Sequence, residues 1–249
     1  MIDTIFNHRS IRKFETEPIN PDILNIILEA GIRASTTGNM QVYSIIVTTS
    51  KELKDKLWEC HFKQDMVKTA PVILTFCADF NRFNKWCELR EAKPGYNNFL
   101  SFMTGAIDAL LAAQNIAIAA EAYGLGICYL GTAIYNAKEI SEILEIPKNV
   151  VPITAIAMGY PSEIPPLTDR LPLEAVVHYE KYYDYDDDKI NLLYSQKENL
   201  PFYQELVKLN NKKNLAQIFT DNRYKKEDNV LFSKKYLEFI KKQGFMNNE

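Results

Sequence analysis

Four residues near the start of the chain could together bind an anion. The segment HRSIRKF, at positions 8 to 14, places His8, Arg9, Ser10 and Arg12 within five residues. Guanidinium groups present paired N–H donors that match phosphate oxygens, and the imidazole and hydroxyl can add further hydrogen bonds. A solvated helix end could have the same composition. The segment alone therefore leaves both interpretations open.

Three other segments carry groups that suit a phosphorylated or flat ligand. STTGNMQ, at 35–41, concentrates hydroxyl and amide side chains between a predicted helix and a predicted strand, as an ordinary turn also does. YLGT, at 129–132, ends a predicted buried strand on Gly131, where a backbone N–H can approach a ligand closely. In LTDRLP, at 167–172, Arg170 lies between prolines and is a candidate for a second phosphate contact.

The usual catalytic motifs are missing from the sequence. It has no G-x-S-x-G, H-E-x-x-H or P-loop motif, and YGLGICYLG has the wrong spacing for a Rossmann turn. The histidines are scattered and the four cysteines form no C-x-x-C pair, which argues against a metal centre or a disulfide framework. We therefore expect no metal site and no catalytic side chain. If the protein is an enzyme, a cofactor supplies the reactive atoms.

Composition limits the class of protein. The 249 residues are 47% hydrophobic and 24% charged, with a formal net charge of −3, which predicts a globular chain with one substantial core or two modest ones. The near-neutral balance offers no basic surface for nucleic acid. The N-terminus lacks the apolar stretch of a signal peptide. We expect a cytoplasmic protein with neither nucleic-acid nor membrane partners.

Helices and strands alternate around the candidate segments. Asn20, followed by Pro21 and Asp22, predicts the start of a helix that extends to about residue 33, and Ser50 predicts the cap of the next helix. Asn136 and Glu139 resemble a capping box. Strands are predicted at 43–49, 71–78, 126–131 and 152–159. This pattern predicts an α+β fold whose central mixed, mainly antiparallel sheet is flanked by helices.

The most apolar stretch, residues 99–124, predicts one long helix that ends at Gly124. Asp108, Gln114, Asn115 and Glu121 interrupt it, so its longest wholly apolar run is far shorter than the roughly 18 to 20 residues that a bilayer requires. Apolar residues on nearly every face indicate a helix surrounded by protein. We expect the central helix of a domain or of a homodimer interface, and its length and hydrophobicity suggest a core shared between subunits.

Composition changes after Pro161. A proline-rich segment and the acidic run DYDDD, at 184–188, precede a lysine-rich tail in which LPFYQELVKL and LFSKKYLEFIKK have helical periodicity. Its positive charge indicates either a solvated face or a surface that attracts a phosphorylated ligand. We predict a ligand-binding domain at 1–180 and a helical extension at 181–249 that wraps the core or a partner subunit.

Taken together and in this order, these segments resemble the nitroreductase family of flavoproteins. The resemblance rests on HRSIRKFETEPI, RASTTGNMQVYSI, CADFNR, AIDALLAAQNIAIAAEAYGLG, CYLG, MGYP and LTDRLP, and it covers about residues 5 to 180. It is strongest with the oxygen-insensitive NADPH nitroreductases and NADPH-FMN oxidoreductases. It implies a nitroreductase-like fold, an obligate homodimer and FMN bound at the dimer interface.

The resemblance also implies roles for individual residues. It places His8, Arg9, Ser10 and Arg170 at the FMN phosphate and Arg12 near N1 and O2 of the isoalloxazine. Further FMN-binding positions by resemblance are Thr36, Thr37 and Asn39 from the partner subunit, Gln64 at the flavin and ribityl chain, and Tyr129, Leu130 and Gly131. The backbone N–H of Gly131 would face flavin N5. The anion-binding interpretation of the first segment is therefore favoured.

This chain departs from the subgroup at two places. Thr168 stands where the subgroup commonly has a lysine, which predicts a weaker phosphate contact. The C-terminal region offers mainly lysines where the subgroup uses arginines for the 2′-phosphate of NADPH, so both NADPH and NADH stay open as donors. The resemblance implies ping-pong reduction of nitroaromatics, quinones or free FMN. Two alternatives are a reductive dehalogenase or flavin-fragmenting enzyme, and a non-enzymatic dimer that stores or senses FMN.

Overall fold

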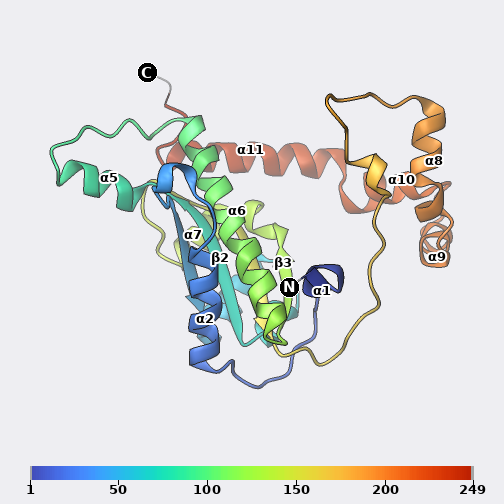
Figure 1. Ribbon diagram of the computed structural model, residues 1–249, viewed down its shortest axis with the longest axis horizontal. Helices are drawn as coiled ribbons and strands as arrows, with labels where there is room; N and C mark the ends of the chain where they lie inside the picture. The colour runs from blue at the N-terminus through green and yellow to red at the C-terminus, as the bar shows by residue number, and fades with distance from the viewer. Residues whose placement is uncertain (1, 248–249) are drawn as a thin grey trace. The chain divides into compact units, whose positions relative to one another are not determined.

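The computed structural model describes residues 2–247, which form two compact units. The first unit comprises residues up to 166 together with those from 232 onward, and the second comprises residues 167–231. The first unit contains the sheet and most of the helices, so it is described first (Figure 1).

A four-stranded sheet forms the centre of the first unit. Its strands are β1 (Tyr43–Thr48), β2 (Val72–Asp79), β3 (Gly126–Leu130) and β4 (Val150–Gly159), in the spatial order β1-β2-β4-β3. All three neighbouring pairs are antiparallel, and a single parallel bridge joins Ser10 to Ile127. Every residue of β2 is buried, as its unbroken apolar run predicts for a strand covered on both faces. The predicted strands and the mainly antiparallel α+β architecture are confirmed.

Helices cover both faces of this sheet. They are α1 (Ile2–Phe6), α2 (Pro21–Ile32), α3 (Lys51–Cys60), α4 (Met66–Thr69), α5 (Asn81–Glu88), α6 (Phe99–Ala122) and α7 (Ala137–Ile143), with two 3-10 turns at Thr37–Asn39 and Gly131–Ile134. One face packs against α2 and α6, around Ile27, Phe76 and Ile116. The opposite face packs against α3, α4 and α7.

Two of the three predicted helix caps are confirmed. The Asn20 side chain accepts a hydrogen bond from the Asp22 N–H at 2.8 Å, and Ser50 Oγ accepts one from Leu53 at 3.4 Å. The capping box at Asn136 is wrong. Its side-chain oxygen accepts no capping hydrogen bond, because the side chain is oriented by its amide nitrogen, which donates to the Cys60 carbonyl at the end of α3 at 2.6 Å.

Helix α6 is the long central helix predicted for residues 99–124. Gly105 lets it approach the sheet, since a Cβ there would lie 2.9 Å from the Cβ of Ala78 in β2. Gly124, at φ +77°, ends it in the left-handed conformation. Within the described residues, α6 alone has the length and composition to cross a membrane, and half of its most apolar window is buried inside the chain. Most of its other large apolar side chains, from Phe99 to Leu111, are exposed.

The second unit is helical. It contains α8 (Asp187–Glu198), α9 (Pro201–Leu209), α10 (Leu215–Gln217) and a π-helical turn at Ile218–Arg223, with a small core around Tyr203, Leu215 and Ile218. Helix α11 (Lys226–Lys242) follows, and its last turns belong to the first unit, where Phe239 and Ile240 join a third apolar cluster. The two helices predicted in the lysine-rich tail are confirmed as α9 and α11.

Candidate functional site

The N-terminal segment, residues 8–12, runs beside strand β3. Ser10 bridges to Ile127, and the Ile11 N–H donates to the Ile127 carbonyl at 2.8 Å. The Ile11 side chain lies directly over Gly126, where a Cβ would come within 2.6 Å of it. Only glycine at 126 permits this packing. The anion-binding candidates are therefore fixed to the edge strand of the sheet rather than to a free helix end.

His8 and Tyr129 are held by polar residues of α6. His8 Nδ1 lies 2.6 Å from Glu121 Oε1 near the end of that helix. The Tyr129 hydroxyl donates to Gln114 Oε1 at 3.2 Å, and burial together with the negative charge of Glu121 raises the pKa of Tyr129 to about 12. Tyr129 therefore stays protonated at neutral pH.

Both arginines of the N-terminal segment lack a carboxylate partner within residues 2–247. Arg9 donates through Nη1 to the Asn7 carbonyl at 2.7 Å, but its Nε is buried without any acceptor in the described chain. Arg12 is exposed and makes only a long 3.5 Å contact with the Ser10 carbonyl. A buried guanidinium nitrogen without an acceptor is costly unless a ligand supplies one. These two cations fit a ligand that carries negative charge, such as FMN.

A second group of side chains surrounds the end of β3. Gln64 donates through Nε2 to the His61 carbonyl at 3.0 Å and lies 3.5 Å from Thr132 Oγ1. His61 Nδ1 lies 2.7 Å from the same hydroxyl oxygen. Leu130 is buried, whereas Gly131 is exposed and no heavy atom outside its chain neighbours lies within 4 Å of the position of a Cβ there. Gln64 and Gly131, which are 67 positions apart, are thus brought together through Thr132.

His61 is wholly buried, and burial lowers its pKa to about 4. Its ring is therefore neutral at pH 7. Its Nε2 atom is buried and has no hydrogen-bond partner among residues 2–247. Neither His61 nor Thr132 is among the residues that the sequence identified.

Thr37 is bonded near the middle of α6, and Thr36 and Asn39 belong to the same loop. Asp108 accepts hydrogen bonds from the Thr37 N–H at 3.0 Å, from the Thr37 hydroxyl at 3.3 Å and from the Val42 N–H at 3.3 Å. Asp108 and Glu121 are 13 residues apart on one helix, which is about 20 Å at 1.5 Å per residue. One chain therefore does not bring the 36–39 loop to the His8 region.

Arg170 belongs to the second unit. Its Nη1 donates to the carbonyls of Asp169 at 2.9 Å and Thr168 at 3.3 Å. The carboxylate of Asp169 is bonded to Lys197 at 2.7 Å and to the Tyr203 hydroxyl at 2.8 Å. This network attaches the LTDRLP segment to α8 and α9, and it leaves the exposed guanidinium of Arg170 without a carboxylate of its own in the described chain.

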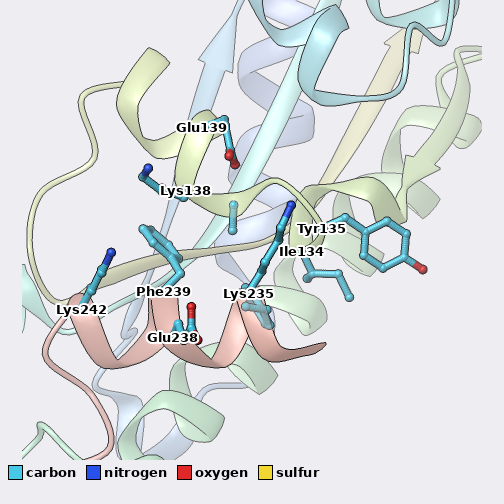
Figure 2. A pocket seen from close by; sticks show the side chains of 10 residues that line it. Ile134, Tyr135, Lys138, Glu139, Lys235, Glu238, Phe239 and Lys242 are labelled. Atoms are coloured by element: carbon cyan, nitrogen blue, oxygen red, sulfur yellow. The ribbon is translucent and has the colours of Figure 1, made fainter. Parts of the chain in front are cut away.

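A pocket of 240 Å³ lies in the first unit between α7 and the last turns of α11. Figure 2 shows Lys138 and Glu139 from α7 facing Lys235, Glu238 and Lys242 from α11, with the Phe239 ring between them. None of the twelve predicted cofactor-binding residues lines it. Eight of them, those of residues 8–12, Gln64 and those of residues 129–131, instead lie at β3 and the turn that follows it, whereas the 36–39 loop is bonded to Asp108 and Arg170 belongs to the second unit.

This arrangement defines a protein of the nitroreductase family. The model of that family matches residues 5–160, which include the N-terminal segment, all four strands and the turn after β3. The chain belongs to this family, as its motifs indicated.

Individual relatives agree with this assignment. The chain is 38% identical over 189 residues to "FMN reductase [NAD(P)H]" of Bacillus subtilis, covering 75% of this chain and 76% of that protein. It is 35% identical over 186 residues to "Oxygen-insensitive NADPH nitroreductase" of Salmonella typhimurium, covering 75% and 76%. A solved oxidoreductase structure from Bacteroides fragilis superposes with a TM-score of 0.97 at 50% identity, covering 98% of this chain and 100% of that one.

Proposed function

We propose that the protein is an FMN-dependent NAD(P)H oxidoreductase that reduces nitroaromatics, quinones or free flavin by two electrons in a ping-pong reaction. The observation that carries the proposal is the pair of arginines beside β3, one with a buried Nε lacking an acceptor in the described chain. Family membership and the names of the relatives support it.

The residues at β3 fit FMN. When bound, FMN accepts hydride from NAD(P)H and passes two electrons to an acceptor, so the reactive atoms belong to the cofactor. His8, Arg9 and Ser10 supply donors for a phosphate. Arg12 supplies a positive charge that stabilises the negative charge that reduction adds. Gln64 supplies an amide group. At Gly131 no side chain obstructs the backbone, so a flat ring can approach it closely.

We further propose that the active form is a homodimer in which the 36–39 loop of one copy completes the site of the other. Helix α6 exposes an apolar stripe made of Phe99, Leu100, Met103, Ile107, Leu110 and Leu111. A contiguous apolar surface of this kind is characteristic of an interface. The distance of about 20 Å along α6 between the two anchoring carboxylates supports this arrangement, since it separates the loop from the His8 region of its own chain.

The domain arrangement and the location remain part of this proposal. We assign FMN binding to residues 1–180 and a helical extension to residues 181–249 that wraps the core or a partner subunit. The packing of Phe239, Ile240 and Phe245 into the third apolar cluster supports the extension's attachment. By the family resemblance we assign Arg170 to the FMN phosphate, and we propose that the enzyme acts in the cytoplasm on small molecules.

An anaerobic absorbance spectrum tests the function. The purified, FMN-loaded protein is recorded before and after stoichiometric NADPH or NADH, and then after a quinone or a nitroaromatic. We expect bleaching of the flavin band by at least one donor and recovery on addition of the acceptor. A protein that takes up no FMN, or whose bound FMN neither donor bleaches, contradicts the proposal.

Sedimentation analysis tests the dimer. We expect the wild type to sediment as a dimer and Leu110→Glu, in the exposed stripe, to sediment as a monomer, because a carboxylate buried at an apolar interface has no partner there. Leu192→Glu is the matched control, since Leu192 is an exposed leucine of α8 outside the stripe. A monomeric wild type contradicts the arrangement.

A further inference from the structure

His61 is connected to the predicted flavin site through a single side chain. Its backbone N–H donates to the Leu57 carbonyl at 3.0 Å, which fixes it at the end of α3. Its Nδ1 atom lies 2.7 Å from Thr132 Oγ1, and Thr132 directly follows Gly131. The buried His61 ring is thus hydrogen-bonded to the turn that contains the exposed Gly131.

The surroundings of His61 require a neutral ring. An imidazolium carries two N–H groups and needs two acceptors, but Nε2 is buried with none in the described chain. Burial, which lowers the pKa of His61 to about 4, acts in the same direction. At neutral pH the ring therefore has one N–H, either on Nδ1 or on Nε2.

The hydrogen bonds favour the proton on Nδ1. If Nε2 carried it, a buried N–H would have no acceptor, which is rarer in proteins than an acceptor without a donor. With the proton on Nδ1, His61 donates to Thr132 Oγ1, toward which the Gln64 amide is also directed at 3.5 Å. The Thr132 oxygen then accepts, and its own proton has no acceptor recorded within residues 2–247.

We infer that His61 and Thr132 form a hydrogen-bond relay that ends on the bound flavin, with Thr132 as a flavin-binding residue and His61 as its positioning residue. This inference rests on the proposed function, since it takes FMN as the ligand. His61 keeps the Thr132 hydroxyl from turning inward, because the oxygen's inner side accepts the Nδ1–H. The hydroxyl proton is donated to a flavin acceptor atom on the edge that Gly131 faces.

The relay has a redox consequence. A donor at an acceptor atom of the flavin stabilises the electron-rich reduced form more than the oxidised form. Removal of the Thr132 hydroxyl should therefore lower the midpoint potential of the bound FMN as well as its affinity. A residue that only packs the turn would change neither property when replaced by a side chain of the same shape.

Thr132→Val and Thr132→Ser form the matched pair of variants. Valine keeps the shape and removes the hydroxyl, whereas serine keeps the hydroxyl. We expect the FMN dissociation constant of Thr132→Val to rise about 2- to 10-fold, which corresponds to one net hydrogen bond, and its flavin potential to fall. Thr132→Ser should stay near the wild type in both. Fluorescence titration with FMN and an anaerobic redox titration measure the two quantities.

His61 is tested in the wild-type apoprotein and in one variant. We expect nitrogen NMR of the apoprotein at pH 7 to show a neutral His61 ring protonated at Nδ1, a result that does not depend on FMN. His61→Asn, whose amide can still donate to Thr132, should retain more FMN affinity than His61→Ala.

The outcomes separate the two proposals. A wild type that binds no FMN overturns the proposed function and the relay together. A wild type that binds FMN while Thr132→Val matches Thr132→Ser in affinity and potential overturns the relay alone. A ring protonated at Nε2 in the NMR spectrum also overturns the relay, even if the variants fold poorly.

Discussion

Helix α6 holds two segments of the chain with two carboxylates, Asp108 near its middle and Glu121 in its last turn, and the two regions differ in how completely their polar groups are paired. Asp108, wholly buried, accepts three hydrogen bonds from the segment of residues 37–42. Glu121 makes a single recorded contact, with His8. In the residue that follows His8, Arg9 Nε is buried without an acceptor in the described chain.

This difference in pairing distinguishes the region that holds the fold together from the region that can bind a ligand. A buried polar group with all its partners fixes the backbone around it and has nothing left to offer a ligand. A buried donor without a partner is tolerated where a ligand completes it, which is why such atoms gather at binding sites. By this criterion the Asp108 region forms the scaffold, and the β3 region, with the unpaired donor of Arg9, forms the site.

The largest effect should follow from removing Asp108. Asp108→Ala leaves the Val42 N–H buried without an acceptor and removes both contacts to Thr37, so we expect a loss of about 3 to 4 kcal/mol in the free energy of unfolding. Urea denaturation measures it. Asp108→Asn, which keeps one acceptor oxygen, should lose less. A loss below about 1 kcal/mol for Asp108→Ala would contradict a scaffold role.

A second prediction concerns pH and His61. Burial lowers the pKa of His61 from 6.5 to about 4. Between these two pH values His61 is protonated in the unfolded chain but not in the folded chain. Holding His61 neutral therefore costs no stability above pH 6.5. As the pH falls from 6.5 toward 4, the free energy of unfolding decreases, by at most about 3 kcal/mol at ~1.4 kcal/mol per pKa unit.

The difference in unfolding free energy between the wild type and His61→Asn isolates this contribution, since the carboxylates titrate in both proteins. We expect the wild type to lose stability relative to the variant as the pH falls from 6.5 to 4. A difference that stays constant over this range would show that His61 is not held neutral by burial.

The third prediction concerns Arg9, in the segment beside β3. Arg9→Ala should weaken FMN binding by about 10- to 100-fold, since a hydrogen bond to a charged group contributes about 1.5 to 3 kcal/mol. Stability should change little, because the side chain has one recorded hydrogen bond, to the Asn7 carbonyl. Fluorescence titration with FMN measures the affinity.

Arg90→Ala is the matched control for Arg9. Arg90 is an exposed arginine that also contacts a neighbouring carbonyl, that of Leu89 at 3.4 Å, and it lies outside the predicted site. We expect its replacement to leave FMN affinity unchanged. Equal FMN affinities for the Arg9 and Arg90 variants would contradict the assignment of the ligand site to the β3 region.

The sequence predicts local features of this fold well. The apolar run of β2 and the caps at Asn20 and Ser50 are determined by neighbouring residues, and the structure confirms them. The Asn136 cap fails because its actual acceptor, the Cys60 carbonyl, is 76 positions away. A local pattern contains no information about such a partner.

The candidate site shows the same limit. The family resemblance selects Gln64 and Gly131, but His61 looks like an isolated histidine because its partner Thr132 is 71 positions away. Asp108 and Glu121 were visible as charges that interrupt an apolar helix. That interruption is a usable signal, since a charged residue in a helix surrounded by protein needs a partner from another segment.

The smallest effect is expected at the other carboxylate of α6. Glu121→Gln keeps the shape of the side chain and an oxygen that can accept from His8, and the pair is partly open to solvent, with 31% of the His8 and 13% of the Glu121 side chain exposed. We expect the free energy of unfolding to change by less than about 1 kcal/mol, as for other partly exposed ion pairs. Urea denaturation beside Asp108→Asn tests this directly. If Glu121→Gln lost as much stability as Asp108→Asn, both carboxylates of α6 would belong to the scaffold, and unpaired donors rather than loosely held carboxylates would mark the site.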